Sequence, residues 1–271
     1  MTLSTLRCGL CSCVASEDTT LAELLTHARD AGVAAVEIDY ERSAPALADM
    51  VLRRQLIEAS RGHDGLLRSL HAPYTPDRDL SSLDEAERRL AVSNNLLALQ
   101  LTRDLDMGIM VLHASEDPIP EGLRPQRIDS ALNSLRQLQE EARRMSVRLA
   151  VETMPPEWLP AGLDEVAAFA DALDPEVVGF CFDINHSNLN ADPVAYIDRF
   201  GSRIIAVHAS DNDGIRQRHW IPGEGIIDWG GFAAALRRND VQAPPMYEVE
   251  PETELAESIP MLRANFERLF G

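Results

Sequence analysis

Short apolar runs alternate with amphipathic segments along nearly the whole chain. The runs are rich in β-branched and aromatic residues, a composition typical of strands buried on both faces. Strands are predicted at residues 6–13, 34–38, 66–70, 109–112, 147–151, 177–182, 204–207 and 246–249. The segments between them carry Leu and Ala at helical spacing and begin at recognisable capping residues.

The intervening segments predict one helix after each strand. The first is capped by Asp18 or Thr19 and ends near residue 30. Others are predicted at 45–60, from a capping box at Ser81 or Ser82 to about 107, from 124, at 163–173, from 193 after Asp192, at 229–238 after Asp228, and at 256–269. A polar, glycine-containing loop is expected at 209–226.

Strand and helix alternate about eight times without a linker, which indicates parallel strands with right-handed crossovers. This number of units in 271 residues fits one closed (β/α)8 TIM barrel, a single domain over residues 1–271. A doubly wound open sheet is the alternative. Such a fold would normally show a glycine-rich phosphate loop after the first strand, and Gly9-Leu10-Cys11 does not supply one.

Ionisable side chains follow the predicted strands. Asp183 ends the run VVGFCFD, and His186 lies three residues later. The same placement recurs for His71, His113, Glu152, His208 and Glu248. Each residue alone could be a capping or hydrogen-bonded rim group, but catalytic groups of such barrels lie at the carboxyl ends of the strands. Carboxylates with imidazoles suit Mn²⁺, Zn²⁺, Co²⁺ or Fe²⁺ better than Ca²⁺, so the set predicts a metal site.

Composition narrows the class of protein. The hydrophobic fraction of 45% and the charged fraction of 25% are ordinary for a globular protein, and no apolar run is long enough to span a membrane. The N-terminus lacks the architecture of a signal peptide, so a cytoplasmic protein is expected. The net charge of −19 argues against a nucleic-acid partner.

The four cysteines invite a metal or redox interpretation because Cys8 and Cys11 form a C-x-x-C pair. A structural zinc site would need a second pair, whereas only Cys13 and the strand residue Cys181 remain. They are expected to be small buried hydrophobic residues.

These motifs, taken in order, resemble the xylose-isomerase-like TIM-barrel superfamily, which includes sugar epimerases, inosose dehydratases, sugar-phosphate isomerases and endonuclease IV. The resemblance covers nearly the whole chain. It is carried by HAPY, VLHAS, AVETMP, FDINH, VHASD, HWIPGEGIIDW and YEVEP.

The resemblance implies a ligand set and residue roles. The epimerase branch holds one divalent metal (Mn²⁺, Zn²⁺, Co²⁺ or Mg²⁺) at positions matching Glu152, Asp183, His208 and Glu248. Glu250 is the alternative last ligand. The resemblance implies substrate contacts for His186 and His219, and His71, His113 and Trp220 are also expected to contact the substrate.

The expected activity is that of a metal-dependent sugar isomerase or epimerase. Glu152 and Glu248 would exchange protons with a carbon beside a carbonyl, and the metal would stabilise the enediolate. A dehydratase or other lyase on a polyol or keto acid is the alternative. A non-catalytic sugar-binding barrel is a third possibility.

An endonuclease IV-like DNA-repair enzyme is a fourth possibility. It would use a second metal near His71 and His113, and that ion remains possible here. A third ion in that family uses an Asp-x-His, where this chain has Gln217-Arg218-His219.

The expected partner is a small sugar or polyol. Arg216, Arg218 and His219 form the basic cluster near the predicted rim, and Asp211 and Asp213 offset it, which favours an unphosphorylated substrate. The resemblance also suggests a homo-oligomer.

Overall fold

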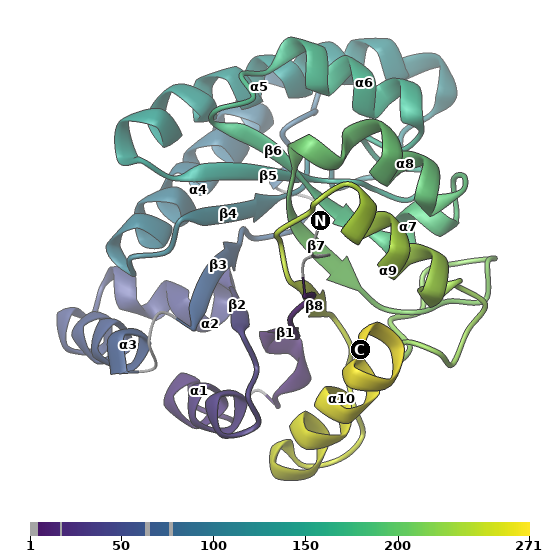
Figure 1. Cartoon of the computed structure of the whole chain (residues 1–271). Coiled ribbons are helices and arrows are strands. Elements are labelled where there is room, and N and C mark those ends of the chain that lie inside the picture. The colour runs from purple at the N-terminus through teal and green to yellow at the C-terminus, as the bar shows by residue number, and fades with distance from the viewer. Residues whose placement is uncertain (1–4, 17, 63–65, 76–77) are drawn as a thin grey trace.

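Eight parallel strands close into a barrel, and helices surround it (Figure 1). The structure is a computed structural model that describes residues 5–16, 18–62, 66–75 and 78–271. Each strand pairs with the next, and β8 pairs with β1, so the predicted (β/α)8 barrel is confirmed and the open sheet is excluded. The strands are β1 (Gly9–Cys11), β2 (Ala35–Asp39), β3 (Leu67–His71), β4 (Ile109–Leu112), β5 (Arg148–Glu152), β6 (Val178–Asp183), β7 (Ile204–Ala209) and β8 (Pro245–Tyr247).

The helices form the outer layer, and α10 lies beside α1 and α9 where the last strand meets the first (Figure 1). None of the described helices has the length and apolar character that a membrane span needs. The helices are α1 (Leu21–Asp30), α2 (Tyr40–Ser43), α3 (Met50–Gly62), α4 (Glu85–Asp104), α5 (Arg124–Met145), α6 (Leu163–Ala172), α7 (Ile184–Asn188), α8 (Pro193–Phe200), α9 (Trp229–Arg238) and α10 (Leu255–Phe270).

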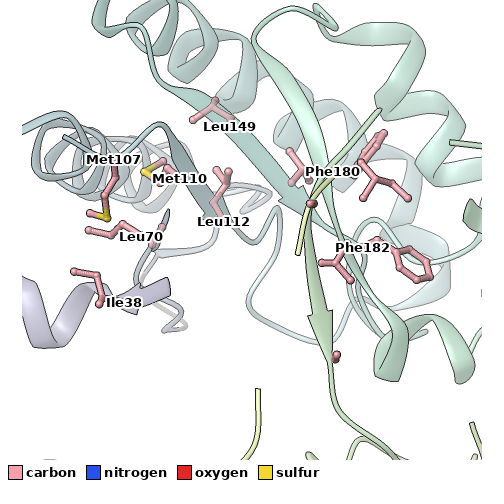
Figure 2. Packing of buried hydrophobic residues seen from close by; sticks show 14 of the residues in the cluster. Ile38, Leu70, Met107, Met110, Leu112, Leu149, Phe180 and Phe182 are labelled. Atoms are coloured by element: carbon pink, nitrogen blue, oxygen red, sulfur yellow. The ribbon is translucent and has the colours of Figure 1, made fainter. Parts of the chain in front are cut away.

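The main core lies between the strands and the helices, and a smaller one fills the barrel. On β4, Met110 and Leu112 pack in the main core, whereas Ile109 and Val111 belong to the inner cluster. Figure 2 shows Met110 and Leu112 with Phe180 and Phe182 of β6 among the residues of the main core. Because side chains alternate along a strand, every second residue of each strand faces the barrel interior.

This alternation determines which strand residues reach the site. On β6 the bulky Val178, Phe180 and Phe182 face outward, so Cys181 and Asp183 face inward. On β5, Ala150 lies in the inner cluster, and Glu152 is two residues further along. The inner cluster below the rim is apolar, and Glu152 and Asp183 stand above it at the carboxyl ends of β5 and β6. The interior is therefore a packed floor beneath a polar site.

Several helix starts differ from prediction because local side-chain bonds decide them. Thr20 caps α1, since its hydroxyl accepts from Glu23 N at 3.2 Å while Glu23 Oε2 accepts from Thr20 N at 2.9 Å. The predicted helix 45–60 is wrong at its start: a 3-10 turn at Ala44–Leu47 precedes α3, and Asp49 Oδ1 accepts from Val51 N at 2.8 Å.

The starts of α4, α8 and α9 are likewise set by capping side chains. Asp84 caps α4 in place of the predicted Ser81 or Ser82. Asp192 and Asp228 cap α8 and α9 as predicted. Two strands are shorter than predicted. The strand predicted at 6–13 is limited to Gly9–Cys11 and is followed by a 3-10 turn at Ser12–Val14, and the strand predicted at 246–249 ends at Tyr247.

Candidate active site

Four ionisable side chains meet at the carboxyl ends of strands β5 to β8. Glu152 and Asp183 end β5 and β6, His208 is next to last in β7, and Glu248 directly follows β8. His208 Nδ1 lies 3.4 Å from Glu152 Oε1, 3.9 Å from Asp183 Oδ2 and 3.5 Å from Glu248 Oε2. One potential ligand atom from each residue lies within 4.8 Å of the other three. The cluster is compatible with a divalent metal ion.

Three of these atoms are buried without a hydrogen-bond partner among the described residues: His208 Nδ1, Asp183 Oδ2 and Glu248 Oε2. Leaving buried polar atoms unpaired is costly, and three such atoms facing one another need a common partner. When the His208 ring is neutral, as metal binding requires, all three offer lone pairs, because the other nitrogen of His208 lies 2.8 Å from Glu37 Oε1 and carries the ring proton. The donor set of carboxylates and imidazole fits a divalent cation.

Asp183 combines capping with participation in the cluster. Its Oδ1 accepts from His186 N at 2.8 Å and caps the short helix α7, while its Oδ2 faces His208. Asp183 is fully buried. The two interpretations of the D-x-x-H motif, a helix cap and a metal ligand, are therefore compatible with one another.

His186 lies on α7 with its ring next to the cluster. Its Nδ1 is 3.0 Å from the carbonyl oxygen of Thr153 and 3.3 Å from Glu152 Oε1. Since Nδ1 faces two acceptors, it carries the proton. The other ring nitrogen, Nε2, is buried without a partner among the described residues.

His71 and His113 hold the second oxygen of Glu152. His71 Nε2 lies 3.1 Å and His113 Nε2 3.2 Å from Glu152 Oε2. His113 Nδ1 in turn lies 3.3 Å from Glu116, a partner that the sequence did not point to. These contacts orient Glu152 so that its Oε1 faces His208.

The two glutamates of the cluster differ in proton affinity. Burial acts to raise the pKa of Glu152, but His208 and His113 outweigh it and hold this pKa well below its usual value. Burial raises the pKa of Glu248, which the nearby Glu152 and Asp183 reinforce against the effect of His208 and His219. Carboxyl groups whose pKa values are driven apart are suited to opposite roles in proton transfer.

A long loop between β7 and α9 is anchored by Asp211, which is fully buried. Its carboxylate accepts from Gly223 N at 2.8 Å, Trp229 Nε1 at 2.8 Å and Ile227 N at 3.3 Å. A Cβ at Gly225 would lie 2.3 Å from Asp211 Oδ1, so this part of the PGEG segment requires glycine.

The anchored loop places His219 over the cluster. His219 has φ of 49°, and its Nδ1 lies 3.0 Å from the carbonyl oxygen of Glu248 and 3.7 Å from Glu248 Oε2. Trp220 pairs its backbone with Asp211, and its partly exposed ring lies under the Arg218 guanidinium at 5.3 Å. The structure thus brings His219 to the cluster and places Trp220 farther out on the loop.

Glu37 is a buried site residue that the sequence analysis did not assign. It faces inward from β2, is 1% exposed, and bonds His208 from the side opposite the cluster. Burial acts to raise its pKa, but His208 and His71 outweigh it, so the pKa is lowered and the carboxyl is ionised. The available signal was an acidic residue at an inward position within the apolar run AVEID.

A cavity of about 710 Å³ opens beside the cluster, at the ends of β1, β2 and β8. Its volume is in the usual range for small-molecule sites. Tyr74 lies in its wall and also contacts the ring of His71, with ring centroids 5.2 Å apart. Glu250 faces this cavity, whereas Glu248 reaches the cluster. The wall is acidic, with Asp39, Glu41, Glu250, Glu252 and Glu254.

The cysteines are free thiols, and Cys8, Cys11 and Cys181 are buried as predicted, with Cys13 partly buried. Burial raises the pKa of the Cys8 thiol to about 12, so it remains protonated near neutral pH. Cys11 Sγ lies 3.8 Å from Glu37 Oε1.

Two relatives of known sequence are each about a quarter identical to this chain, at 27% and 26%. An uncharacterised protein of Methanocaldococcus jannaschii is 27% identical over 166 residues, 59% of this chain and 56% of that protein. The chain thus spans little more than half of that relative. Fructoselysine 3-epimerase of Shigella flexneri is 26% identical over 214 residues, 70% of this chain and 74% of the relative.

Solved structures share the fold closely. A D-tagatose 3-epimerase-like protein aligns with a TM-score of 0.83 and 23% identity, covering 97% of this chain and 98% of its own. The IolI protein with a bound zinc atom aligns with a TM-score of 0.84 and 17% identity, covering 98% of each chain. The model of the xylose isomerase-like TIM barrel family matches residues 25–265. The chain therefore belongs to the xylose isomerase-like TIM barrel family.

Proposed function

We propose that this protein is a divalent-metal-dependent sugar isomerase or epimerase. The observation that carries the proposal is the group of three buried, unpartnered atoms on Asp183, His208 and Glu248, with Glu152 beside them. Relatives with a named activity, such as fructoselysine 3-epimerase, support an enzyme acting on a sugar. The zinc-containing IolI structure has the same fold and is compatible with a metal at this site.

Glu152, Asp183, His208 and Glu248 would hold one ion. When bound, a divalent ion supplies Lewis acidity that favours charge on a substrate oxygen. Mn²⁺, Zn²⁺, Co²⁺ and Mg²⁺ are the candidate ions. A second ion near His71 and His113 is a weaker candidate, because both rings already contact Glu152 Oε2.

Proton transfer falls to the two glutamates. Glu152 and Glu248 would exchange protons with the substrate carbon from its two faces, one removing a proton and the other returning one. An epimerase uses two such groups on opposite faces of the carbon, and their roles exchange in the reverse direction. His186 Nε2, which has no partner among the described residues, hydrogen-bonds a substrate oxygen, and His219 covers the Glu248 side.

The substrate proposed here is small and unphosphorylated. The cavity beside the cluster is lined by several carboxylates, which disfavour a phosphate group. Its one lining arginine, Arg42, donates to the backbone carbonyls of Thr19, Ala15 and Ser16. On the far loop, Arg218 pairs with Asp213 at 2.8 Å.

Solvent exchange tests the proposal. Metal-loaded protein is incubated in deuterated water with a panel of free ketoses, and the products are followed by nuclear magnetic resonance. We expect deuterium at one carbon beside the carbonyl, together with an epimer or isomer of the same composition. Loss of one water from the product would instead identify a lyase. Absence of exchange with every sugar, while metal is bound, would contradict the proposed activity.

A further inference from the structure

Glu37 is a carboxyl group buried in the interior of the barrel, where its burial carries a cost that its hydrogen-bond partners must offset. It projects from the middle of β2, below the rim on which the other ionisable residues stand. Ser69 donates to its Oε2 at 2.6 Å from the neighbouring strand β3. Its Oε1 is the acceptor for His208 Nε2 at 2.8 Å. Glu37 therefore joins β2 and β3 to the side chain on β7.

The contact determines which nitrogen of His208 faces the cluster. A carboxylate can only accept, so the proton of the imidazole lies on Nε2. Nδ1 then carries a lone pair, and this atom lies 3.4 to 3.9 Å from oxygens of Glu152, Asp183 and Glu248. Without Glu37, the proton could move to Nδ1 and bond one of these carboxylates instead, which would remove a ligand atom from the cluster.

We propose that Glu37 is a positioning residue of this site: through its bond to Nε2 it orients the His208 ring and keeps Nδ1 available to a divalent metal. This inference rests on the metal site of the proposed function. Residues that bond the outer nitrogen of a metal-bound histidine fix its tautomer and raise its basicity, and their loss typically weakens metal affinity by about 10- to 100-fold.

The test is Mn²⁺ affinity, measured calorimetrically on full-length protein that was first stripped with a chelator. Glu37→Gln keeps the size of the side chain and an oxygen acceptor but removes the charge. We expect the dissociation constant for Mn²⁺ to rise about 10- to 100-fold. Ser69→Ala removes only the hydroxyl that supports Glu37 Oε2, so we expect a rise of a few fold, in the same direction.

Asp79→Asn is the matched control. Asp79 is also a buried carboxylate, but it bonds Ser81 and Arg127 rather than a residue of the cluster. We expect its change to lower thermal stability and to leave the Mn²⁺ dissociation constant unchanged. This control separates the loss of a buried carboxylate in general from the loss of this one.

The outcomes distinguish this inference from the proposed function. If the wild type binds no Mn²⁺ or other divalent ion, the proposed metal site itself is wrong. If the wild type binds one ion and Glu37→Gln binds it equally well, only the positioning role is wrong, even where the variant melts earlier. Two ions in the wild type and one in Glu37→Gln would make Glu37 a ligand, together with Cys11 and His208, and would also overturn the inference. If Glu37→Gln does not fold, Ser69→Ala decides, and an unchanged dissociation constant would overturn the positioning role.

Discussion

The two halves of the barrel rim carry similar residue types but arrange them differently. In the β5–β8 half, atoms of Asp183, His208 and Glu248 face one another without a hydrogen-bond partner among the described residues. In the β1–β4 half, His71, His113 and Glu37 are bonded to members of that cluster. One half therefore offers free lone pairs, and the other half orients the groups that carry them.

The cavity adds to this contrast. It opens over the ends of β1, β2 and β8, and its wall carries several carboxylates. The β5–β8 half is closed by the loop that Asp211 anchors. Histidines and acids at strand ends are thus not equivalent: hydrogen bonding decides which of them remain available to a metal or a substrate.

The largest effect is expected from Asp183→Asn. The amide retains the Oδ1 cap of α7 but replaces the charged Oδ2 that faces His208. Metal occupancy should fall strongly, and the rate of proton exchange should fall by about 10³-fold or more. Metal analysis of the purified variant, beside the exchange assay, measures both.

Asp192→Asn is the control for this change, because Asp192 caps α8 in the same way at a distance from the cluster. We expect it to cost about 1 kcal/mol of stability or less and to leave metal content unchanged. Full occupancy in Asp183→Asn would show that Asp183 is only a helix cap.

His186→Ala should separate substrate binding from metal binding. The variant loses the unpartnered Nε2 of His186 but none of the four proposed ligands. We expect metal content close to that of the wild type and a loss of about 10- to 100-fold in kcat/KM, the cost of one hydrogen bond to a charged or strongly polarised group. Loss of metal from this variant would show that His186 is itself a metal ligand, which would indicate a site that holds more than one ion.

The stability of the metal-free protein should fall as the pH rises. The pKa of His186 is raised to about 9, because Asp183 and Glu152 outweigh the opposing effect of burial. A raised pKa contributes stability that is present below the unfolded value near 6.5 and is lost as the pH rises through about 9. We expect a loss of up to about 3 kcal/mol across this window.

Thermal melts of chelator-treated protein between these pH values measure this change. With Mn²⁺ present, stability should instead rise as the pH rises, because metal binding requires the deprotonated imidazole of His208. Identical pH profiles with and without metal would argue against an ion in the cluster.

The smallest expected effect concerns phosphate. With a matched pair of free and phosphorylated sugars, we expect kcat/KM to favour the free sugar by at least about tenfold, because like charges would meet in the cavity. Glu250→Gln combined with Glu252→Gln should narrow this preference without altering metal content, since both residues line the cavity wall. A clear preference for the phosphorylated sugar would contradict the proposed substrate class.

The ionisable residues at the strand ends were predictable from the sequence, because each directly follows a short apolar run that marks a buried strand. Asp183 is the last residue of a buried strand and faces inward, and Glu152 is likewise the inward-facing last residue of its strand. The cap of α8 was predictable for the same reason, since Asp192-Pro193 is a local signal. The family resemblance, which is now confirmed, supplied the order of the ligand set.

Long-range partners were not predictable. Glu37 and His208 are 171 positions apart, so nothing near Glu37 in the sequence indicates its bond to the imidazole. Glu116 was missed for a similar reason, since its role depends on the orientation of His113 toward Glu152. The five-residue helix α7 was also missed, because it is too short to show periodicity and depends on the Asp183 cap.

The most direct test of the account is the position of the metal. Crystals of the Mn²⁺-loaded wild type, measured for anomalous scattering at the manganese edge, should show one strong peak. We predict this peak within bonding distance of Glu152, Asp183, His208 and Glu248, on the Nδ1 side of His208. A peak between His71 and His113 alone, or beside Cys11 and Glu37, would contradict the assignment of the β5–β8 half as the metal site.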